Sequence, residues 1–386
     1  MKKSIISLVL SLNFAICISQ PLDYIIEGYV SNVDSGMIYI VPVINEAKYY
    51  GPNSMKDSAI IKDGLFKFRR IHNNNNTYAY RLYIQSNISS GSTDFVFING
   101  ENVFIEIDSI DEHISPKIAN STYQNEIKYE YNDFFEKFIV DVNRYFEYEE
   151  GIYNKFDGNI PKEIVLEFEA KQKLISHQSD SLFQLYAELH PNSHVTLWKM
   201  IERLKNIGHN SSYRSIFNKF PVEIRNSQIG LIFLQDLYAS ELLSINSVFP
   251  ELQFQNIQEE ITVIDKSKLG SSFTLVDFWF TDCIPCRKQF PELKRLFKIY
   301  RQYGFQIIGI SIDEESKIDT WRNLIQKESL NWLHLLDKSG KTTTKLAINS
   351  FPTNFLLNSD GVILKKNITI SDLATLLLES YKKIGK

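Results

Sequence analysis

The sequence predicts three successive parts: a small β-sandwich, a helical segment and a C-terminal α/β domain. Three observations predict this order. Short β-rich runs separated by turn residues occupy residues 24–108. From about residue 123 to residue 243 the apolar residues recur every three or four positions, which is typical of helices. An apolar run, two cysteines and another helical pattern then follow one another from residue 273.

The first part consists of short apolar runs bounded by Asp, Asn and Gly turns. The predicted strands lie at residues 24–30, 37–44, 57–61, 65–68, 78–84, 95–98 and 103–107. Short strands at this spacing are typical of a small β-sandwich. We place this domain at residues 20–115.

The middle part, residues 116–248, has amphipathic patterns and no turn-rich strands. The predicted helices lie at residues 127–142, 164–189, 195–207 and 229–243. Aromatic residues on these faces are expected to form a packed core rather than a ligand site. Six histidines are scattered, with no metal-ligand spacing, and we assign them no chemistry: His72, His113, His177, His190, His194 and His209.

The third part, residues 249–386, alternates strands and helices. The strands are expected at 273–280, 305–312, 331–336, 355–357 and 362–364, and helices at 314–327, 342–348 and 370–384. One more helix is expected after the first strand, with its apolar positions between Phe290 and Tyr300. A strand–helix–strand unit followed by a hairpin and a helix predicts a mixed sheet covered by helices.

Cys283 and Cys286 stand between the first of these strands and the helix after it. A helix N-terminus favours a thiolate, and two cysteines at this spacing can close and reopen a disulfide. The pattern therefore predicts a thioredoxin-like redox site. The alternative, half of a zinc site, lacks a second ligand pair. We expect no metal and no cofactor.

The first nineteen residues predict a secretory signal peptide. Lys2 and Lys3 precede a short apolar run, and Cys17 and Ser19 are small residues suited to cleavage before Gln20. An uncleaved N-terminal anchor and a lipoprotein are the alternatives. After cleavage only Cys283 and Cys286 remain, so the pair is expected to be catalytic rather than structural. We expect an exported protein, in the periplasm or attached to the membrane.

Overall composition limits the class of protein. Hydrophobic residues make up 44% and charged residues 23% of the 386 residues, so the chain can bury sizeable cores. The formal net charge is −4, without long blocks of one sign. This balance argues against a nucleic-acid partner.

From about residue 261 to the end, the chain resembles the TlpA/ResA type of exported thioredoxin-like thiol-disulfide oxidoreductases. The residues that carry the resemblance are Phe278-Trp279, Cys283-Ile-Pro-Cys-Arg287, Pro291, Gly309-Ile-Ser-Ile-Asp313, Trp321, Trp332 and Phe351-Pro-Thr353. The front half resembles an uncharacterised β-domain found ahead of such proteins, through Asp57-Ser-Ala59, Asp63-Gly64, Phe66 and Phe68.

The resemblance implies a role for each matching position. Cys283 matches an exposed attacking cysteine and Cys286 a buried resolving one. Pro352 matches a cis-proline that faces the pair. Asp277 matches the buried acid of thioredoxin itself; the alternative is a polar residue at a strand end.

Three residues in or beside the motif are expected to tune it. Asp282 stands where the family usually has an aromatic residue, and Ile284 is apolar where many relatives are polar or small. Neither Ile284 nor Pro285 brings a hydrogen-bond donor to the thiolate. Asp282 and Asp277 oppose the thiolate by like-charge repulsion, which predicts a potential on the reducing side.

We therefore expect an enzyme that reduces disulfides in exported proteins. The family implies a disulfide-bearing exported protein as substrate and a membrane thiol carrier as electron donor. One alternative is an exported ligand- or partner-binding protein whose redox domain serves for docking or sensing. Another is a peroxiredoxin-like peroxidase, although Phe280 stands where that chemistry usually has Thr.

Overall fold

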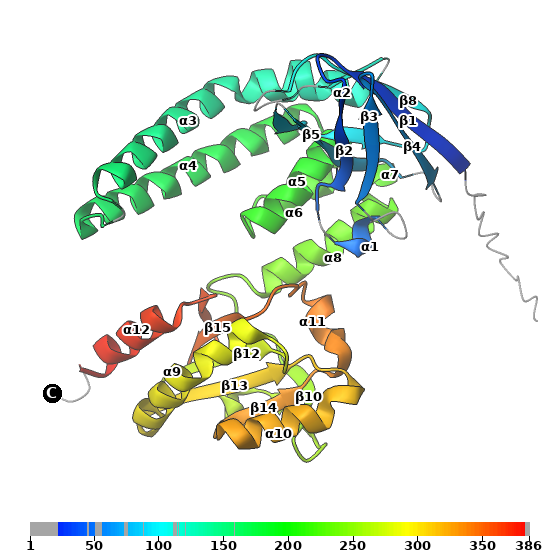
Figure 1. Cartoon of the computed structure of the whole chain (residues 1–386). Coiled ribbons are helices and arrows are strands. Elements are labelled where there is room, and N and C mark those ends of the chain that lie inside the picture. Colours follow the sequence, from blue (N-terminus) through cyan, green and yellow to red (C-terminus); the bar gives the residue numbers. More distant parts are fainter. Residues whose placement is uncertain are drawn as a thin grey trace, which may run out of the picture. The chain divides into compact units, whose positions relative to one another are not determined.

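The computed structural model describes residues 22–44, 46–50, 56–72, 76–87, 89–110, 114, 116–119, 121–157 and 159–382. The expected signal peptide and His113 lie outside these residues. The chain forms two compact units, shown in Figure 1. The first runs to Glu202 and also contains Lys219–Ile229; the second contains Arg203–Asn218 and Gly230–Lys386. The expected boundaries after residues 115 and 248 stay predictions.

The described strands of the first unit belong to one sheet. They are β1 (Leu22–Val30), β2 (Ser35–Pro42), β3 (Asp57–Lys62), β4 (Leu65–His72), β5 (Tyr78–Ser86), β6 (Ser90–Ser92), β7 (Val96–Ile98), β8 (Val103–Ile107) and β9 (Lys117–Ile118). Their order is β6-β5-β2-β3-β4-β1-β8-β9, and β7 also pairs with β5. A sandwich needs two packed sheets. The predicted β-sandwich is therefore not confirmed.

Helices follow the sheet along the chain, and the longer ones overlap the predicted ranges 127–142, 164–189, 195–207 and 229–243. The short helices at Tyr213–Lys219 and Val222–Arg225 were not predicted. The helices are α2 (Thr122–Glu126), a π-helix (Ile127–Tyr131), α3 (Asn132–Lys155), α4 (Lys162–Leu189), α5 (His194–Asn206), α6 (Tyr213–Lys219), α7 (Val222–Arg225) and α8 (Gln228–Leu242); a short α1 (Ala47–Tyr50) lies between β2 and β3. Helices α3 and α4 run side by side (Figure 1). No helix in the described part of the chain is both long and apolar enough to cross a membrane.

The second unit contains a mixed sheet. Its strands are β10 (Leu252–Asn256), β11 (Ile261–Ile264), β12 (Phe273–Trp279), β13 (Phe305–Ser311), β14 (Leu333–Leu336), β15 (Thr353–Asn358) and β16 (Ile363–Lys366). The order is β11-β10-β14-β13-β12-β15-β16. Strands β12, β13 and β14 are parallel, and β15 is antiparallel to β12.

Helices cover this sheet and bury strand β12 on both faces. The helices are α9 (Ile284–Tyr300), α10 (Ile318–Glu328), α11 (Lys341–Lys345) and α12 (Ile370–Lys382), with 3-10 turns at Lys266–Lys268, Arg301–Tyr303, Glu315–Lys317 and Lys338–Gly340. Leu275 packs with residues of α9 and α12, whereas Val276 packs in a separate apolar cluster. Side chains alternate between faces along a strand, so both faces of β12 are buried. The predicted mixed sheet covered by helices is confirmed.

Candidate active site

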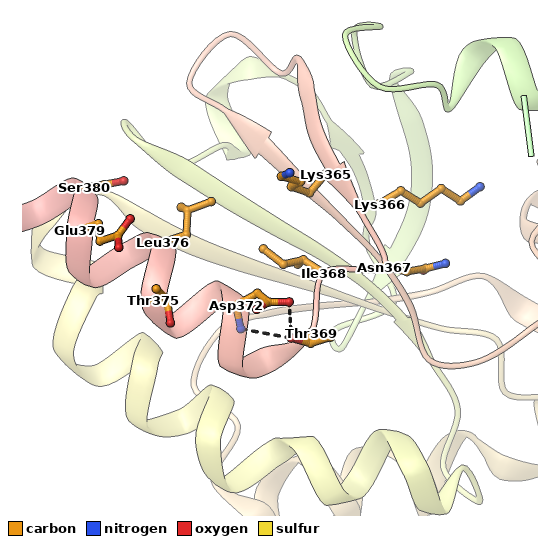
Figure 2. Close-up of a pocket in the computed structure, with 10 residues that line it drawn as sticks. All are labelled: Lys365, Lys366, Asn367, Ile368, Thr369, Asp372, Thr375, Leu376, Glu379 and Ser380. Carbon is orange, nitrogen blue, oxygen red and sulfur yellow. Dashed lines mark hydrogen bonds between the residues drawn. The ribbon is translucent and has the colours of Figure 1, made fainter. Parts of the chain in front are cut away.

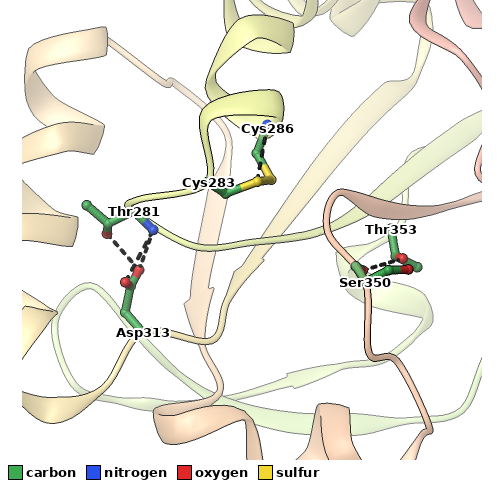
Figure 3. Close-up of a disulfide and its surroundings, with 6 residues drawn as sticks. All are labelled: Thr281, Cys283, Cys286, Asp313, Ser350 and Thr353. Carbon is green, nitrogen blue, oxygen red and sulfur yellow. Dashed lines mark hydrogen bonds between the residues drawn. A yellow bond between two sulfur atoms is a disulfide. The ribbon is translucent and has the colours of Figure 1, made fainter. Parts of the chain in front are cut away.

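The two cysteines lie where the loop after β12 enters α9. Cys283 is the N-cap of α9, and its sulfur accepts a hydrogen bond from the backbone N–H of Cys286 at 3.2 Å. The pair forms a disulfide with 5.3 Å between the Cα atoms (Figure 3). The predicted strand–turn–helix placement is confirmed. The N–H that caps the sulfur is also positioned to stabilise a thiolate there.

Both cysteines are buried in this disulfide form. Cys283 is 3% exposed and Cys286 is 1% exposed. The expectation of an exposed Cys283 is therefore wrong for this state. The reason is packing: both cysteines lie in an apolar cluster with Trp279, Phe290 and Trp321. The exposed part of the motif is Asp282, Ile284 and Pro285, between and beside the cysteines.

The Phe351–Pro352 peptide bond is cis, as predicted. Phe351 packs against the apolar cluster that contains both cysteines. Thr353, which begins β15, donates a hydrogen bond from its hydroxyl to the carbonyl of Ser350 at 2.7 Å (Figure 3). This bond ties the two ends of the proline turn together. Contact between Pro352 and the sulfurs stays a prediction.

Asp277 is the fifth residue of β12 and is 5% exposed. In the sheet it lies opposite Gly309 of β13 and Asn354 of β15. Its Oδ1 atom has no hydrogen-bond partner among the described residues. Burial raises the pKa of the Asp277 carboxyl to about 7. A carboxyl with a pKa close to the working pH is suited to proton transfer.

Asp313, two residues beyond β13, holds the loop that leads to Cys283. Its carboxylate accepts the backbone N–H of Thr281 at 3.0 Å and 3.2 Å and the Thr281 hydroxyl at 2.7 Å (Figure 3). The Ser311 hydroxyl donates to the same carboxylate at 2.6 Å. The sequence interpretation assigned Asp313 no role. A signal existed, because loops that follow neighbouring parallel strands meet at one edge of a sheet.

Comparison with known proteins agrees with this geometry. The model of the AhpC/TSA family matches residues 245–366. The thiol-disulfide oxidoreductase ResA of Bacillus thuringiensis (strain Al Hakam) is 25% identical over 171 residues, covering 44% of this chain and 95% of the relative. ResA of Bacillus subtilis (strain 168) is 29% identical over 123 residues, covering 32% and 66%. The C-terminal part of this chain is a thioredoxin-like oxidoreductase domain of the TlpA/ResA type.

Two solved structures are similar to the same domain. A thiol-disulfide oxidoreductase from Bacteroides fragilis NCTC 9343 shares 31% identity and covers 34% of this chain and 98% of its own, with a TM-score of 0.32. The thioredoxin domain of a thiol-disulfide oxidoreductase from Bacteroides vulgatus shares 26% identity over 36% and 97%, also with a TM-score of 0.32.

The TlpA/ResA-type domain also has a cation beside its motif that sequence reasoning missed. Lys317 donates a hydrogen bond to Asp282 Oδ2 at 2.5 Å, and this bond raises the pKa of Lys317. Lys317 lies 34 residues beyond Cys283, outside any local motif, so spacing gave no signal. The repulsion between Asp282 and a Cys283 thiolate is therefore partly offset.

A separate hollow of about 470 Å³ lies between β16 and α12 of the same domain (Figure 2). None of the predicted site residues lines it. Thr369 and Asp372, which do line it, hydrogen-bond to each other at the start of α12. Within the described residues, no group of three or more His, Cys, Asp or Glu side chains is arranged to hold a metal ion.

Proposed function

We propose that this thiol-disulfide oxidoreductase reduces disulfides in exported proteins through the dithiol of Cys283 and Cys286. The observation that carries the proposal is the Cys283–Cys286 disulfide at the N-terminus of α9, in a domain of the TlpA/ResA type. A disulfide that can be opened by thiol exchange forms a redox couple with its dithiol. The helix N-terminus stabilises the thiolate of the reduced form, which makes that form reactive.

The reaction proceeds by two thiol exchanges. The Cys283 thiolate attacks one sulfur of the substrate disulfide, which breaks the substrate S–S bond and forms a mixed disulfide. The other substrate sulfur leaves as a thiolate and takes up a proton. Cys286 then loses its proton, attacks Cys283 and releases the second substrate thiol. The substrate disulfide gains two electrons and two protons, and the protein dithiol becomes the disulfide.

Asp277 is the proposed base for Cys286. Because the pKa of Asp277 is about 7, a substantial fraction of the carboxyl is still ionised near neutral pH. This ionised fraction can accept the Cys286 proton. The unpartnered Oδ1 atom of Asp277 is an available acceptor. Phe351 packs against the apolar cluster of the cysteines, and Pro352, which follows it through a cis bond, is the proposed contact for the substrate backbone.

The proposal includes a location and an electron donor. The expected signal peptide supports export, most directly to the periplasm. An exported dithiol needs re-reduction outside the cytosol, so we propose a membrane thiol carrier as donor. That carrier would attack the Cys283–Cys286 disulfide by the same exchange in reverse.

Insulin reduction tests the activity, with precipitation of the reduced B chain in excess dithiothreitol as readout. The wild-type chain should accelerate precipitation, and Cys283→Ser should abolish the acceleration. Expression of Cys286→Ser in cells should trap a mixed disulfide with an exported protein, separable on a non-reducing gel. A wild type no faster than Cys283→Ser, with no trapped species, would instead favour the binding-protein alternative. Rapid peroxide consumption by the dithiol would favour the peroxidase.

A further inference from the structure

The two residues just before Cys283 are both held by the segment that follows β13. Thr281 is held by Asp313, and Asp282 by Lys317. These two contacts differ in burial. Asp313 and Thr281 are 6% and 3% exposed, whereas the Lys317 and Asp282 side chains are 44% and 65% exposed.

Burial decides which contact fixes the loop. Exposed ion pairs are screened by water and contribute little to holding a structure. A buried carboxylate that accepts several hydrogen bonds in a low-dielectric site holds its donors much more strongly. Asp313 accepts from the backbone N–H and the hydroxyl of Thr281 and from the hydroxyl of Ser311. It therefore joins the loop before Cys283 to the end of β13.

We propose that Asp313 is a positioning residue that holds Cys283 at the N-cap of α9 and so maintains the reactivity of its thiolate. This inference rests on the proposed function. Thr281 is only two residues from Cys283, so a shift of Thr281 moves the N-cap sulfur away from the Cys286 N–H at 3.2 Å. Losing that alignment removes part of the thiolate stabilisation that a helix N-terminus provides.

The negative charge of Asp313 and its positioning of the loop change the pKa of the Cys283 thiol in opposite directions. The charge alone disfavours a nearby thiolate, so removing it should lower the thiolate pKa. Releasing the loop should raise that pKa. Asp313→Asn removes the charge but keeps an oxygen that can accept the Thr281 N–H. Asp313→Ala removes both charge and acceptors. The difference between these two variants isolates positioning from charge.

The full-length protein also offers a matched control. Asp337 is 4% exposed and accepts the Thr342 N–H at 3.1 Å, the Thr343 N–H at 2.7 Å and the Thr343 hydroxyl at 2.7 Å. Its carboxylate thus has nearly the same kind of partners in the same unit, but they belong to α11 and not to the Cys283 loop. Asp337→Ala should cost stability without changing Cys283.

The experiment is the pH dependence of Cys283 alkylation by iodoacetamide in the reduced full-length chain, read by peptide mapping. Asp313→Ala should alkylate about two- to fivefold more slowly than wild type at pH 7, the size of a helix-terminus effect, with a raised apparent pKa. Asp313→Asn should react at least as fast as wild type, and Asp337→Ala should match wild type. Equal rates for Asp313→Ala and Asp313→Asn would overturn the proposal, as would equal slowing in Asp337→Ala.

A milder variant keeps the test informative if Asp313→Ala fails to fold. Thr281→Val removes the hydroxyl bond, keeps the N–H bond and nearly preserves volume, so a smaller slowing is expected. Unchanged alkylation in Thr281→Val, with Asp313→Ala unfolded, would count against positioning. The readout is independent of any substrate. Slowed alkylation together with an inactive wild type in the insulin assay would therefore refute the proposed function and leave the positioning role standing.

Discussion

At the scale of single residues, the buried Asp277 carboxyl, with its pKa raised to about 7, predicts a specific pH dependence of the folding stability. In the unfolded chain the group ionises near pH 3.9. Between about pH 4 and pH 7 the folded state therefore binds more protons, and its stability falls as the pH rises. The full penalty is present above pH 7.

Asp277→Asn should remove this penalty. The variant should gain stability over wild type by about 2–3 kcal/mol more at pH 8 than at pH 5, measured by urea unfolding of the oxidised protein. In the insulin assay at pH 7 it should lose activity, by about a hundredfold if Asp277 is the base for Cys286. If the stability difference between the variant and wild type does not change with pH, the pKa of Asp277 is not raised in the folded protein.

Cys283 should be the attacking thiol although its side chain is buried in the disulfide form. Its sulfur receives the N–H of Cys286 at the helix N-terminus, whereas Cys286 lies one turn inside the helix. Limiting iodoacetamide added to the reduced protein should therefore label Cys283 first. Preferential labelling of Cys286 would reverse the roles of the two sulfurs.

Substitutions of Asp282 and Lys317 should shift the redox potential of the Cys283–Cys286 couple in opposite directions. Lys317→Met leaves Asp282 unpaired beside the thiolate and should make the couple more reducing, whereas Asp282→Asn should make it more oxidising. Each shift should be on the order of 10 mV in glutathione buffers, because both groups are exposed. The double variant should return close to wild type. Additive shifts in the same direction would exclude a charge effect.

Part of this site could be predicted from the sequence and part could not. The disulfide of Cys283 and Cys286, the burial of Asp277 and the cis bond before Pro352 were predictable, because each residue stands within a local motif. Lys317 and the role of Asp313 were not assigned. Lys317 lies 34 residues beyond Cys283, and the signal for Asp313 is only that the loops after the parallel strands β12 and β13 meet at one edge of the sheet. The burial of Cys283 was missed for a related reason: the aromatic residues around it come from separate elements.

At the scale of elements, strand β13 approaches its neighbours closely at Gly309. A Cβ atom there would lie 3.1 Å from Nδ1 of His334, 3.2 Å from Nε1 of Trp279 and 3.3 Å from Nε1 of Trp332. The sequence predicted the strand, but not that a methyl group at one of its positions would press against three neighbouring rings. Spacing along one segment contains no information about side chains from β12 and β14.

Gly309→Ala should destabilise the second unit by about 1–3 kcal/mol, because the rings of buried Trp279 and His334 and of partly buried Trp332 must shift. The matched control is Gly151→Ala in α3, where a Cβ meets nothing within 4 Å. That change should stabilise its helix by about 0.5–1 kcal/mol. Thermal unfolding followed by circular dichroism checks both. A neutral Gly309→Ala would mean that these three rings can shift without loss of stability.

At the scale of the whole molecule, the two units differ in how well the sequence anticipated them. Five strands of the mixed sheet in the second unit were predictable because strands and helices alternate along the chain, whereas β10 and β11 were not predicted. In the first unit the strand positions were largely predicted, but their partners were not. Strand β1 pairs with β4 in an antiparallel and with β8 in a parallel arrangement, which joins the described strands into one sheet. Alternation of apolar residues identifies a strand, not its neighbour.

The core of the redox unit, the thioredoxin-like part of the second unit, includes residues that precede its predicted start. Leu243, just after α8, is 2% exposed and lies in the apolar cluster that contains Phe249 and Val276. The backbone that follows it is hydrogen-bonded to β16, from Asn246 N–H to the Ile363 carbonyl at 2.8 Å and from Ile363 N–H to the Ser247 carbonyl at 2.9 Å. Residues before the predicted start at 249 thus contribute to this core.

Leu243→Ala in the full chain should therefore destabilise the redox unit by about 2–4 kcal/mol, as expected for a buried leucine. The control is Val248→Ala, since Val248 is 64% exposed and its truncation should change stability by less than about 0.5 kcal/mol. Amide hydrogen exchange in β12, read by mass spectrometry, reports this unit alone. Faster exchange only in Leu243→Ala would show that the redox core includes Leu243. Equal exchange in the two variants would leave residue 249 as a sufficient start.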